Sequence, residues 1–332
     1  MFRSLSLVPY RLTGLALGFA CLSATGVVSA QRMTTSPEQA YDLGDIPSAR
    51  AVGMGGALNA LGVSTTALYL NPANMALARV YHLEALGAYS PEAQRETIGL
   101  AIVDSVINTS HLSGGVAATY NQFDPNGLHR VWTDIRAGMA LPLGDHFAFG
   151  VTGRWLRVDQ AVSQGPFGAS YASDGSSGSP IFNSLTFDVG ATATLEGFHL
   201  GVVGHNLTNP GTSLAPTNAA AGIGYLSQTF AIEVDGLLDF TTWEKTEGRV
   251  MAGGEVFLAD HYAVRAGWRY DAGTAIHAAS LGFGYIDPRW SIELGMRHDL
   301  IGAHSGTLGV LSLRYFYDAT GSTTPSDEPD AF

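Results

Sequence analysis

A two-residue alternation of apolar and polar side chains runs through the chain from about residue 80 to residue 317. It is clearest in residues 184–195, 262–271 and 290–299, which carry polar or charged side chains on one face. This period is that of a β-strand whose two faces meet different surroundings. The runs reach about ten residues, whereas globular strands average about five or six and membrane strands need ~9–11. The pattern therefore favours a membrane barrel over a β-sandwich.

Short and long connections alternate between the expected strands. Short turns are expected at 108–109, 144–145, 196–197, 227–228, 259–260 and 287–288, and the other connections are mostly longer. Such asymmetry is typical of outer-membrane barrels, whose short turns face the periplasm. The sequence thus predicts an all-β fold, a 14-stranded antiparallel transmembrane β-barrel with both chain ends in the periplasm. The expected strands are 80–89, 95–106, 110–121, 129–142, 146–159, 183–195, 198–207, 217–226, 229–239, 248–258, 261–271, 275–286, 289–299 and 306–317.

Composition supports a barrel surrounded by outer-membrane lipid. Only 14% of the residues are charged, against about 25% in a soluble domain, and the mean hydropathy is +0.13. After the first thirty residues no apolar run approaches the ~20 residues of a membrane helix, which excludes a multi-helix membrane protein. A net charge of −12 and a single lysine, Lys245, argue against a nucleic-acid partner.

The N-terminus indicates export. Arg3 and Arg11 precede an apolar stretch, and Val28-Ser29-Ala30 forms a small-x-small cleavage site, as in a secretory signal peptide. The only cysteine, Cys21, lies inside this segment, so no disulfide framework is expected. We predict a protein of the outer membrane of a Gram-negative bacterium. Its expected parts are a signal peptide (1–30), an N-terminal helical plug inside the lumen (31–79), the barrel (80–317) and a disordered periplasmic tail (318–332).

The segment before the first strand reads as helical. Ser48 is a plausible N-cap and Gly62 a plausible stop, which predicts one helix over about 48–61, and a second short helix is expected at 64–70. Gly53, Gly55 and Gly56 imitate the start of a dinucleotide fingerprint. No strand precedes them, so we expect close packing of a helix against the barrel wall and no cofactor.

Two stretches of this segment carry a family resemblance. Residues 51–57 (AVGMGGA) and 66–76 (TALYLNPANMA) resemble the N-terminal plug of the long-chain fatty-acid transporter (FadL) superfamily, and Asn71, Pro72 and Ala73 match its Asn-Pro-Ala motif. The resemblance implies a hatch inside the barrel and hydrophobic cargo released laterally into the membrane. PorV-like barrels share the pattern and include partners of secretion systems, and the short outer loops here suit that branch. Asn71-Pro72 is either a hinge or a helix stop.

Charged side chains of the alternating segments are expected inside the barrel. Arg265 and Arg269 are suited to hold a ligand carboxylate, because the guanidinium offers a planar fork of donors. The alternative is a ladder of mutual salt bridges, which opposite charges on neighbouring strands favour. The candidate lumen residues for either role are Arg136, Arg154, Arg265, Arg269, Glu293 and Arg297.

Two further features bear on the barrel wall. Gly114-Gly115 interrupts the third expected strand, and by the family resemblance this pair marks a lateral gate; the alternative is a packing gap or bulge. Trp132, Trp155, Trp268 and Trp290 are interpreted as parts of the interfacial aromatic girdles.

The favoured function is passive transport of small hydrophobic, fatty-acid-like molecules through the plugged barrel. The alternative is a PorV-like outer-membrane scaffold that binds secreted or periplasmic protein partners. An apolar cavity beside the plug would favour cargo, and a lumen filled by charged ladders would favour the scaffold. An enzyme is not expected, because no Gly-x-Ser-x-Gly element or rim triad is found, and the ten histidines lack the spacing of a metal site.

Overall fold

The computed structural model describes residues 48–106, 112–123, 130–160, 180, 182–210, 215–259, 261–301 and 306–317. The predicted signal peptide (1–30), residues 31–47 of the predicted plug and the predicted tail (318–332) lie outside the described residues.

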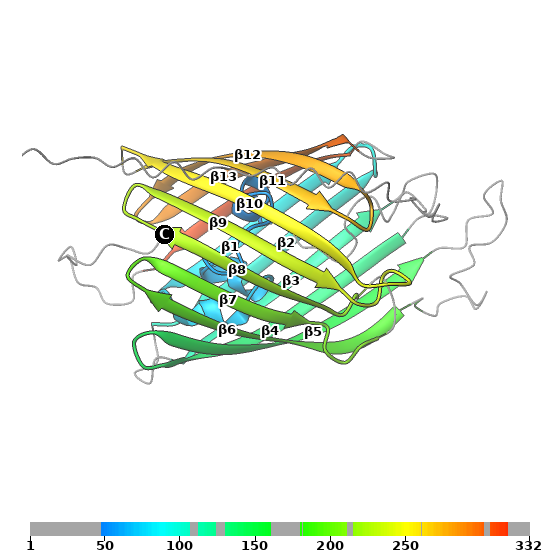
Figure 1. Ribbon diagram of the computed structural model, residues 1–332, viewed down its shortest axis with the longest axis horizontal. Coiled ribbons are helices and arrows are strands. Elements are labelled where there is room, and N and C mark those ends of the chain that lie inside the picture. The colour runs from blue at the N-terminus through cyan, green and yellow to red at the C-terminus, as the bar shows by residue number, and fades with distance from the viewer. Residues whose placement is uncertain are drawn as a thin grey trace, which may run out of the picture. The chain divides into compact units, whose positions relative to one another are not determined.

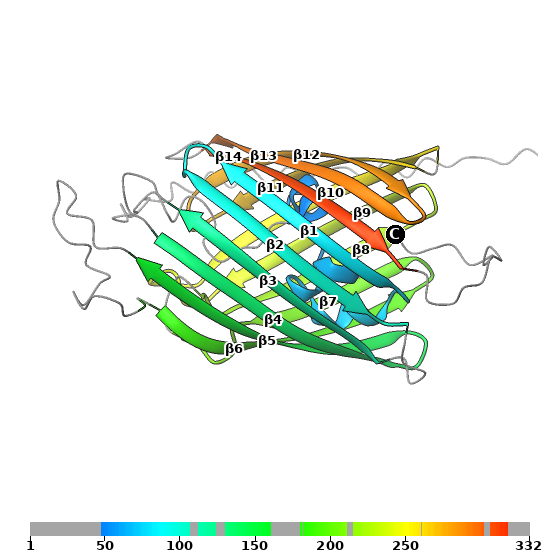
Figure 2. The same ribbon diagram turned by 180° about the vertical axis from the view of Figure 1, so that it is seen from behind.

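The described residues form a closed antiparallel barrel of fourteen strands (Figure 1 and Figure 2). Each strand pairs with its neighbours in sequence, and β1 closes the barrel by pairing with β14. All fourteen predicted segments are strands, with ends within three residues of the expected positions. The strands are β1 Tyr81–Ser90, β2 Arg95–Asp104, β3 Ser113–Phe123, β4 Arg130–Leu143, β5 Phe147–Gln160, β6 Phe182–Leu195, β7 Phe198–His205, β8 Asn218–Leu226, β9 Phe230–Asp239, β10 Glu247–Leu258, β11 Tyr262–Asp271, β12 Ile276–Asp287, β13 Trp290–Ile301 and β14 Thr307–Phe316.

The two ends of the barrel differ as the sequence predicts, with one exception. Turns of two or three residues join β4 to β5, β6 to β7, β8 to β9, β10 to β11 and β12 to β13. The exception is the turn expected at 108–109, which lies outside the described residues, between the end of β2 at Asp104 and the start of β3 at Ser113. The longer connections lie at the other end, which we call the long-loop end.

The wall is apolar outside and polar inside. Leu100 and Leu281 are 67% and 69% exposed on the outer face, whereas the inward-facing Glu233 and Arg265 are each 2% exposed. This reverses the arrangement of a soluble protein and is the arrangement expected of a barrel in lipid.

Residues 48–79, here called the inner segment, lie within the ring of strands (Figure 1 and Figure 2). They contain α1 (Ala49–Gly53) and two 3₁₀ helices, η2 (Ser64–Leu68) and η3 (Pro72–Ala76). The side chain of Ser48 caps α1 as predicted, and the side chain of Asn71 caps η3 by accepting from the amide of Ala73. Among the described residues no helix has the length and apolar character needed to cross a membrane.

The prediction of one helix over 48–61 is wrong. Helix α1 ends at Gly53, and the chain then turns, because Gly55 and Gly56 adopt φ of +70° and +92°. Only glycine takes this conformation without strain.

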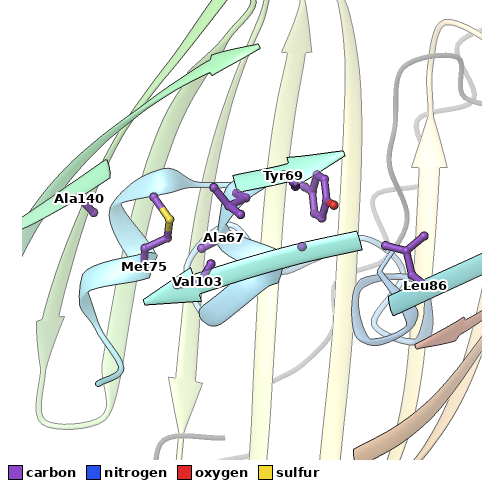
Figure 3. Close-up of a cluster of buried hydrophobic side chains, with 9 residues drawn as sticks. Ala67, Tyr69, Met75, Leu86, Val103 and Ala140 are labelled. Carbon is purple, nitrogen blue, oxygen red and sulfur yellow. The ribbon is translucent and has the colours of Figure 1, made fainter. Parts of the chain in front are cut away.

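Figure 3 shows the inner segment packed on the wall through Ala67, Tyr69 and Met75, which meet Leu86, Val103 and Ala140.

Inward-facing glycines form the surface on which the inner segment rests. A methyl carbon at Gly53 would lie 3.0 Å from the Cα of Gly282, and one at Gly253 would lie 2.9 Å from the Cα of Met54. Both are shorter than ordinary contacts, so backbone packs directly on backbone here. The expectation of close packing at Gly53, Gly55 and Gly56 is confirmed. An added Cβ would strike the side chains of Asn71 and Pro72 at Gly190. Wall glycines whose added Cβ would strike backbone atoms of the inner segment are Gly150, Gly201, Gly253, Gly267 and Gly295.

Two predictions about the wall need correction. The third strand is not interrupted at Gly114 and Gly115, because both residues pair in register with β2 and with β4. Trp132 does not belong to an outer girdle: it faces inward, is 4% exposed and packs with Phe123, Leu156 and Val158. The lateral gate at Gly114-Gly115 itself stays a prediction.

Candidate functional site

An alternating chain of buried charges runs along the inner face of the barrel wall, near the end of the barrel with the short turns. Glu255 pairs with Arg265, Arg265 with Glu293 at 2.7 Å, Glu293 with Arg314 at 2.8 Å, and Arg314 with Glu84 at 3.3 Å. The members come from β10, β11, β13, β14 and β1, so the pairs tie neighbouring parts of the wall together. We call this set the ion-pair ladder.

The inner segment is attached to both ends of the ladder. Arg50 donates to Glu255 at 2.8 Å, and the hydroxyl of Thr65 donates to Glu84. Thr66 also accepts from Arg314 at 3.1 Å. The ladder therefore holds the inner segment as well as the strands.

A second group of charges lies on β4, β5 and β6. Asp134 pairs with Arg136 at 3.0 Å and with Arg154 at 2.6 Å, and Arg136 lies 3.5 Å from Asp188. Arg136 also donates to the carbonyls of Leu68 and Tyr69 at 3.4 and 3.3 Å, and its guanidinium lies 5.3 Å from the centroid of the Tyr69 ring. This group fixes the end of η2 in the lumen.

Two carboxylates of β9 hold the turn between α1 and η2. Asp235 accepts from the amide and the side chain of Asn59 at 3.0 and 2.8 Å, and Glu233 accepts from the amides of Ala60 and Leu61. Both carboxylates are almost fully buried, with Asp235 at 1% and Glu233 at 2% exposure. They accept from backbone donors that would otherwise have no partner in the lumen.

A cavity of about 120 Å³ lies between the inner segment and the wall. Its apolar lining includes Val52, Leu70, Leu237 and Met251. The polar and charged residues around it are Asn59, Tyr69, Arg136, Arg154, Asp188, His205, Asn206, Asn218, Arg249, Arg269 and Arg297. The cavity is thus an amphipathic site inside the barrel, and it is the strongest candidate for a ligand site.

The structure separates the predicted lumen residues into two groups. Arg265 and Glu293 belong to the ion-pair ladder, so the salt-bridge interpretation holds for them. Arg136, Arg154, Arg269 and Arg297 line the cavity, where Arg136 and Arg154 pair with Asp134 and the other two also have interaction partners. Of the plug motif, only Gly55 and Gly56 line the cavity, whereas Asn71 caps η3 and packs against Gly190.

Several residues of the site were not predicted from the sequence. Arg314 and Glu84 complete the ladder, and the alternation of their strands already placed them on the polar face. Tyr69 and Asn59 line the cavity from the inner segment, and no periodic signal identifies them. Burial raises the pKa of the Tyr69 hydroxyl far above its usual value, with Glu84 adding to the effect, so the phenol keeps its proton.

No cluster of three or more metal-ligating side chains occurs in the part of the chain that the structure describes.

Comparison with solved structures identifies the fold. The barrel matches the CymD monoaromatic hydrocarbon channel with a TM-score of 0.59 and 14% identity, over 81% of this chain and 96% of that one. A FadL homologue of Pseudomonas aeruginosa gives 0.59 and 14%, over 82% and 99%. The toluene transporter TodX of Pseudomonas putida gives 0.57 and 11%, over 82% and 98%. The chain has the FadL-type barrel fold.

No protein-family model and no curated protein sequence matches the chain. At sequence identities this low, structural similarity establishes the fold but not the function, which has to be argued from the residues of the site.

Proposed function

We propose that the chain is an outer-membrane channel that passes small hydrophobic molecules, with the inner segment as its plug. The observation that carries the proposal is the cavity between the inner segment and the wall, with Val52, Leu70, Leu237 and Met251 in its lining. A concave site that combines apolar lining with placed polar groups is the usual form of a small-molecule site. The channels of the same fold are named for hydrocarbons and toluene, which supports the same class of cargo.

The export signal, the outer-membrane location and the periplasmic tail belong to this proposal. They are supported by the apolar outer face and by the turn asymmetry, since short turns face the periplasm in known barrels. With that orientation the cavity lies nearer the cell exterior than the ion-pair ladder does. Cargo would enter from the long-loop end and meet the plug before the ladder.

Besides Gly114-Gly115, a second place in the barrel wall is suited to lateral exit of cargo from the lumen. Leu237 and Arg249 line the lumen cavity and also an apolar depression of about 720 Å³ across β5–β10. Phe149, Val202 and Val250 line this depression, and about half of each of these side chains is exposed on the outer face. We propose that cargo leaves the lumen near Leu237, where the same residues border both spaces.

The PorV-like scaffold finds no support in the comparisons, which return channels and transporters. The ion-pair ladder fills only part of the lumen, and the apolar cavity that favours cargo is also present.

Uptake of toluene by liposomes that contain the purified protein tests the proposal. Leu70→Trp fills the cavity and is expected to abolish most of the protein-dependent uptake. Leu200→Trp, on the outer face of β7, is the matched control and should leave uptake unchanged. Uptake that is equal to protein-free liposomes, or that Leu70→Trp does not alter, would overturn the proposed function.

A further inference from the structure

Some residues that line the cavity carry buried polar atoms without a hydrogen-bond partner among the residues that the structure describes. Among these atoms are the hydroxyl of Tyr69 and the amide oxygens of Asn59 and Asn218. Tyr69 and Asn59 are 5% and 3% exposed, so bulk water does not compensate them. A buried polar atom without a partner costs free energy, and native proteins keep few of them.

The geometry of the two amides fixes which atom is unpaired. The NH₂ group of Asn59 donates to Asp235 at 2.8 Å, and that of Asn218 donates to the carbonyl of Pro216 at 3.3 Å. Carboxylates and carbonyls only accept, so the remaining atom of each amide is the oxygen. The residues that line the cavity therefore include two with an unused amide oxygen as acceptor, and Tyr69 with a phenol as donor.

The cations of the cavity are already engaged. Arg136 and Arg154 share Asp134, and Arg249 pairs with Asp271 at 2.7 Å. Arg269 and Arg297 have interaction partners as well. A ligand carboxylate would have to compete with these partners for the buried guanidinium groups.

The size of the cavity limits the ligand. Its volume of about 120 Å³ is close to the roughly 150 Å³ of an engineered apolar cavity that binds benzene. One six-membered ring fills such a space, whereas a long acyl chain would not fit within it. The apolar lining suits the ring, and the unpaired atoms suit one hydroxyl group, which can donate and accept at once.

We propose that the cavity selects a neutral molecule of single-ring size that carries a hydroxyl group, such as a phenol, over a carboxylate and over a plain hydrocarbon. This inference rests on the proposed function and narrows its cargo. Tyr69 is the specificity residue: its hydroxyl donates to the oxygen of the ligand, whose own hydroxyl donates to Asn59 or Asn218.

Calorimetric titration of the purified full-length protein in detergent with phenol, toluene and benzoate tests the inference. A net hydrogen bond of this kind corresponds to about three- to tenfold in affinity. We expect phenol to bind tighter than toluene by at least this factor, and benzoate to bind weakest. Tyr69→Phe should lower the phenol affinity about three- to tenfold and leave the toluene affinity unchanged. Tyr120→Phe, on the outer face of β3, is the matched control and should change neither.

The ligand-free stability of Tyr69→Phe provides a second readout. Removing a hydroxyl that has no partner is expected to leave the melting temperature unchanged or higher, whereas loss of a structural hydrogen bond would lower it. Toluene binding without a preference for phenol would overturn the inference and leave the proposed function standing. Tighter binding of benzoate would overturn the inference in favour of an anionic cargo. Absence of binding of all three would count against the proposed function as well.

Discussion

Gly253 and Gly254 are neighbours on β10 that face opposite sides of the wall, and an alanine at each is expected to have different consequences. A methyl group at Gly253 would lie 2.9 Å from the Cα and the carbonyl carbon of Met54, and closer still to the carbonyl oxygen. At Gly254 the nearest atoms, on Ala231 and Ile232, are 3.8 Å away, which is an ordinary contact. Gly253→Ala is therefore expected to displace the inner segment from the barrel wall, whereas Gly254→Ala is not.

The magnitude follows from the cost of overpacking, which is typically about 1–3 kcal/mol. If this cost falls on the docked state of the inner segment, the undocked population rises about five- to 150-fold. Met54 meets the wall through backbone atoms, which cannot rotate away as a flexible side chain does. The strands themselves are expected to remain paired, because the three atoms nearest to the added methyl group all belong to Met54.

Limited proteolysis with trypsin measures this population. Arg50 is 4% exposed in the docked segment, so cleavage after it requires undocking, and its rate follows the open fraction when closing is fast. We expect faster cleavage after Arg50 in Gly253→Ala and no change in Gly254→Ala. Equal cleavage rates in the two variants would refute the idea that inward glycines seat the inner segment.

Three further predictions concern the ladder, the lipid face and the long-loop end. Arg314→Met leaves Glu84 and Glu293 without their shared cation and should cost about 3–5 kcal/mol in denaturant unfolding, whereas Arg157→Met breaks an exposed pair with Asp159 and should cost under about 1 kcal/mol. Leu281→Arg, at the middle of β12, should lower the free energy of unfolding in a lipid bilayer by about 2–4 kcal/mol, whereas Ile301→Arg, at the end of β13, should lower it by about 0–1 kcal/mol. Equal losses of stability in the two variants would contradict the membrane placement. Partial burial alone would raise the pKa of Glu92, but hydrogen bonds from the amide and the hydroxyl of Thr307 lower this pKa below its ordinary value of 4.5. The contact between Glu92 and Thr307 is therefore fully formed above pH 4.5 and is lost as the pH falls through the lowered pKa. The exchange protection factor of the Thr307 amide should fall in that range, and Glu92→Gln should remove this pH dependence.

The strands and the charged lumen could be predicted from sequence because one local rule generates both. Alternation places Glu255, Arg265 and Glu293 on the polar face without knowledge of their partners. The same rule places Trp132 with Asp134 and Arg136 on the inside. Its assignment to a girdle followed residue type instead of position, and it was wrong for that reason.

The cavity could not be predicted, because it depends on contacts between distant parts of the chain. Asn59 meets Asp235 of β9, and Tyr69 lies under Arg136 of β4. The course of the inner segment depends on the positive φ of Gly55 and Gly56, which ended the expected helix early. No period in the sequence encodes where such a turn places the following side chains.

Under the proposed function, the anchors of the inner segment predict a local shift when cargo passes and not expulsion of the whole segment. Expulsion would take Arg50 away from Glu255 and would remove the backbone donors that Glu233 and Asp235 accept from. Each carboxylate would then remain buried without these partners, at a cost of several kcal/mol. Tyr69 and Leu70, in contrast, border the cavity, and Leu70 has no charged anchor among the described contacts. We therefore expect the amides of Ala60 and Leu61 to stay protected from hydrogen exchange while cargo passes. Fast exchange at these amides in the presence of cargo would show that the whole segment leaves the lumen.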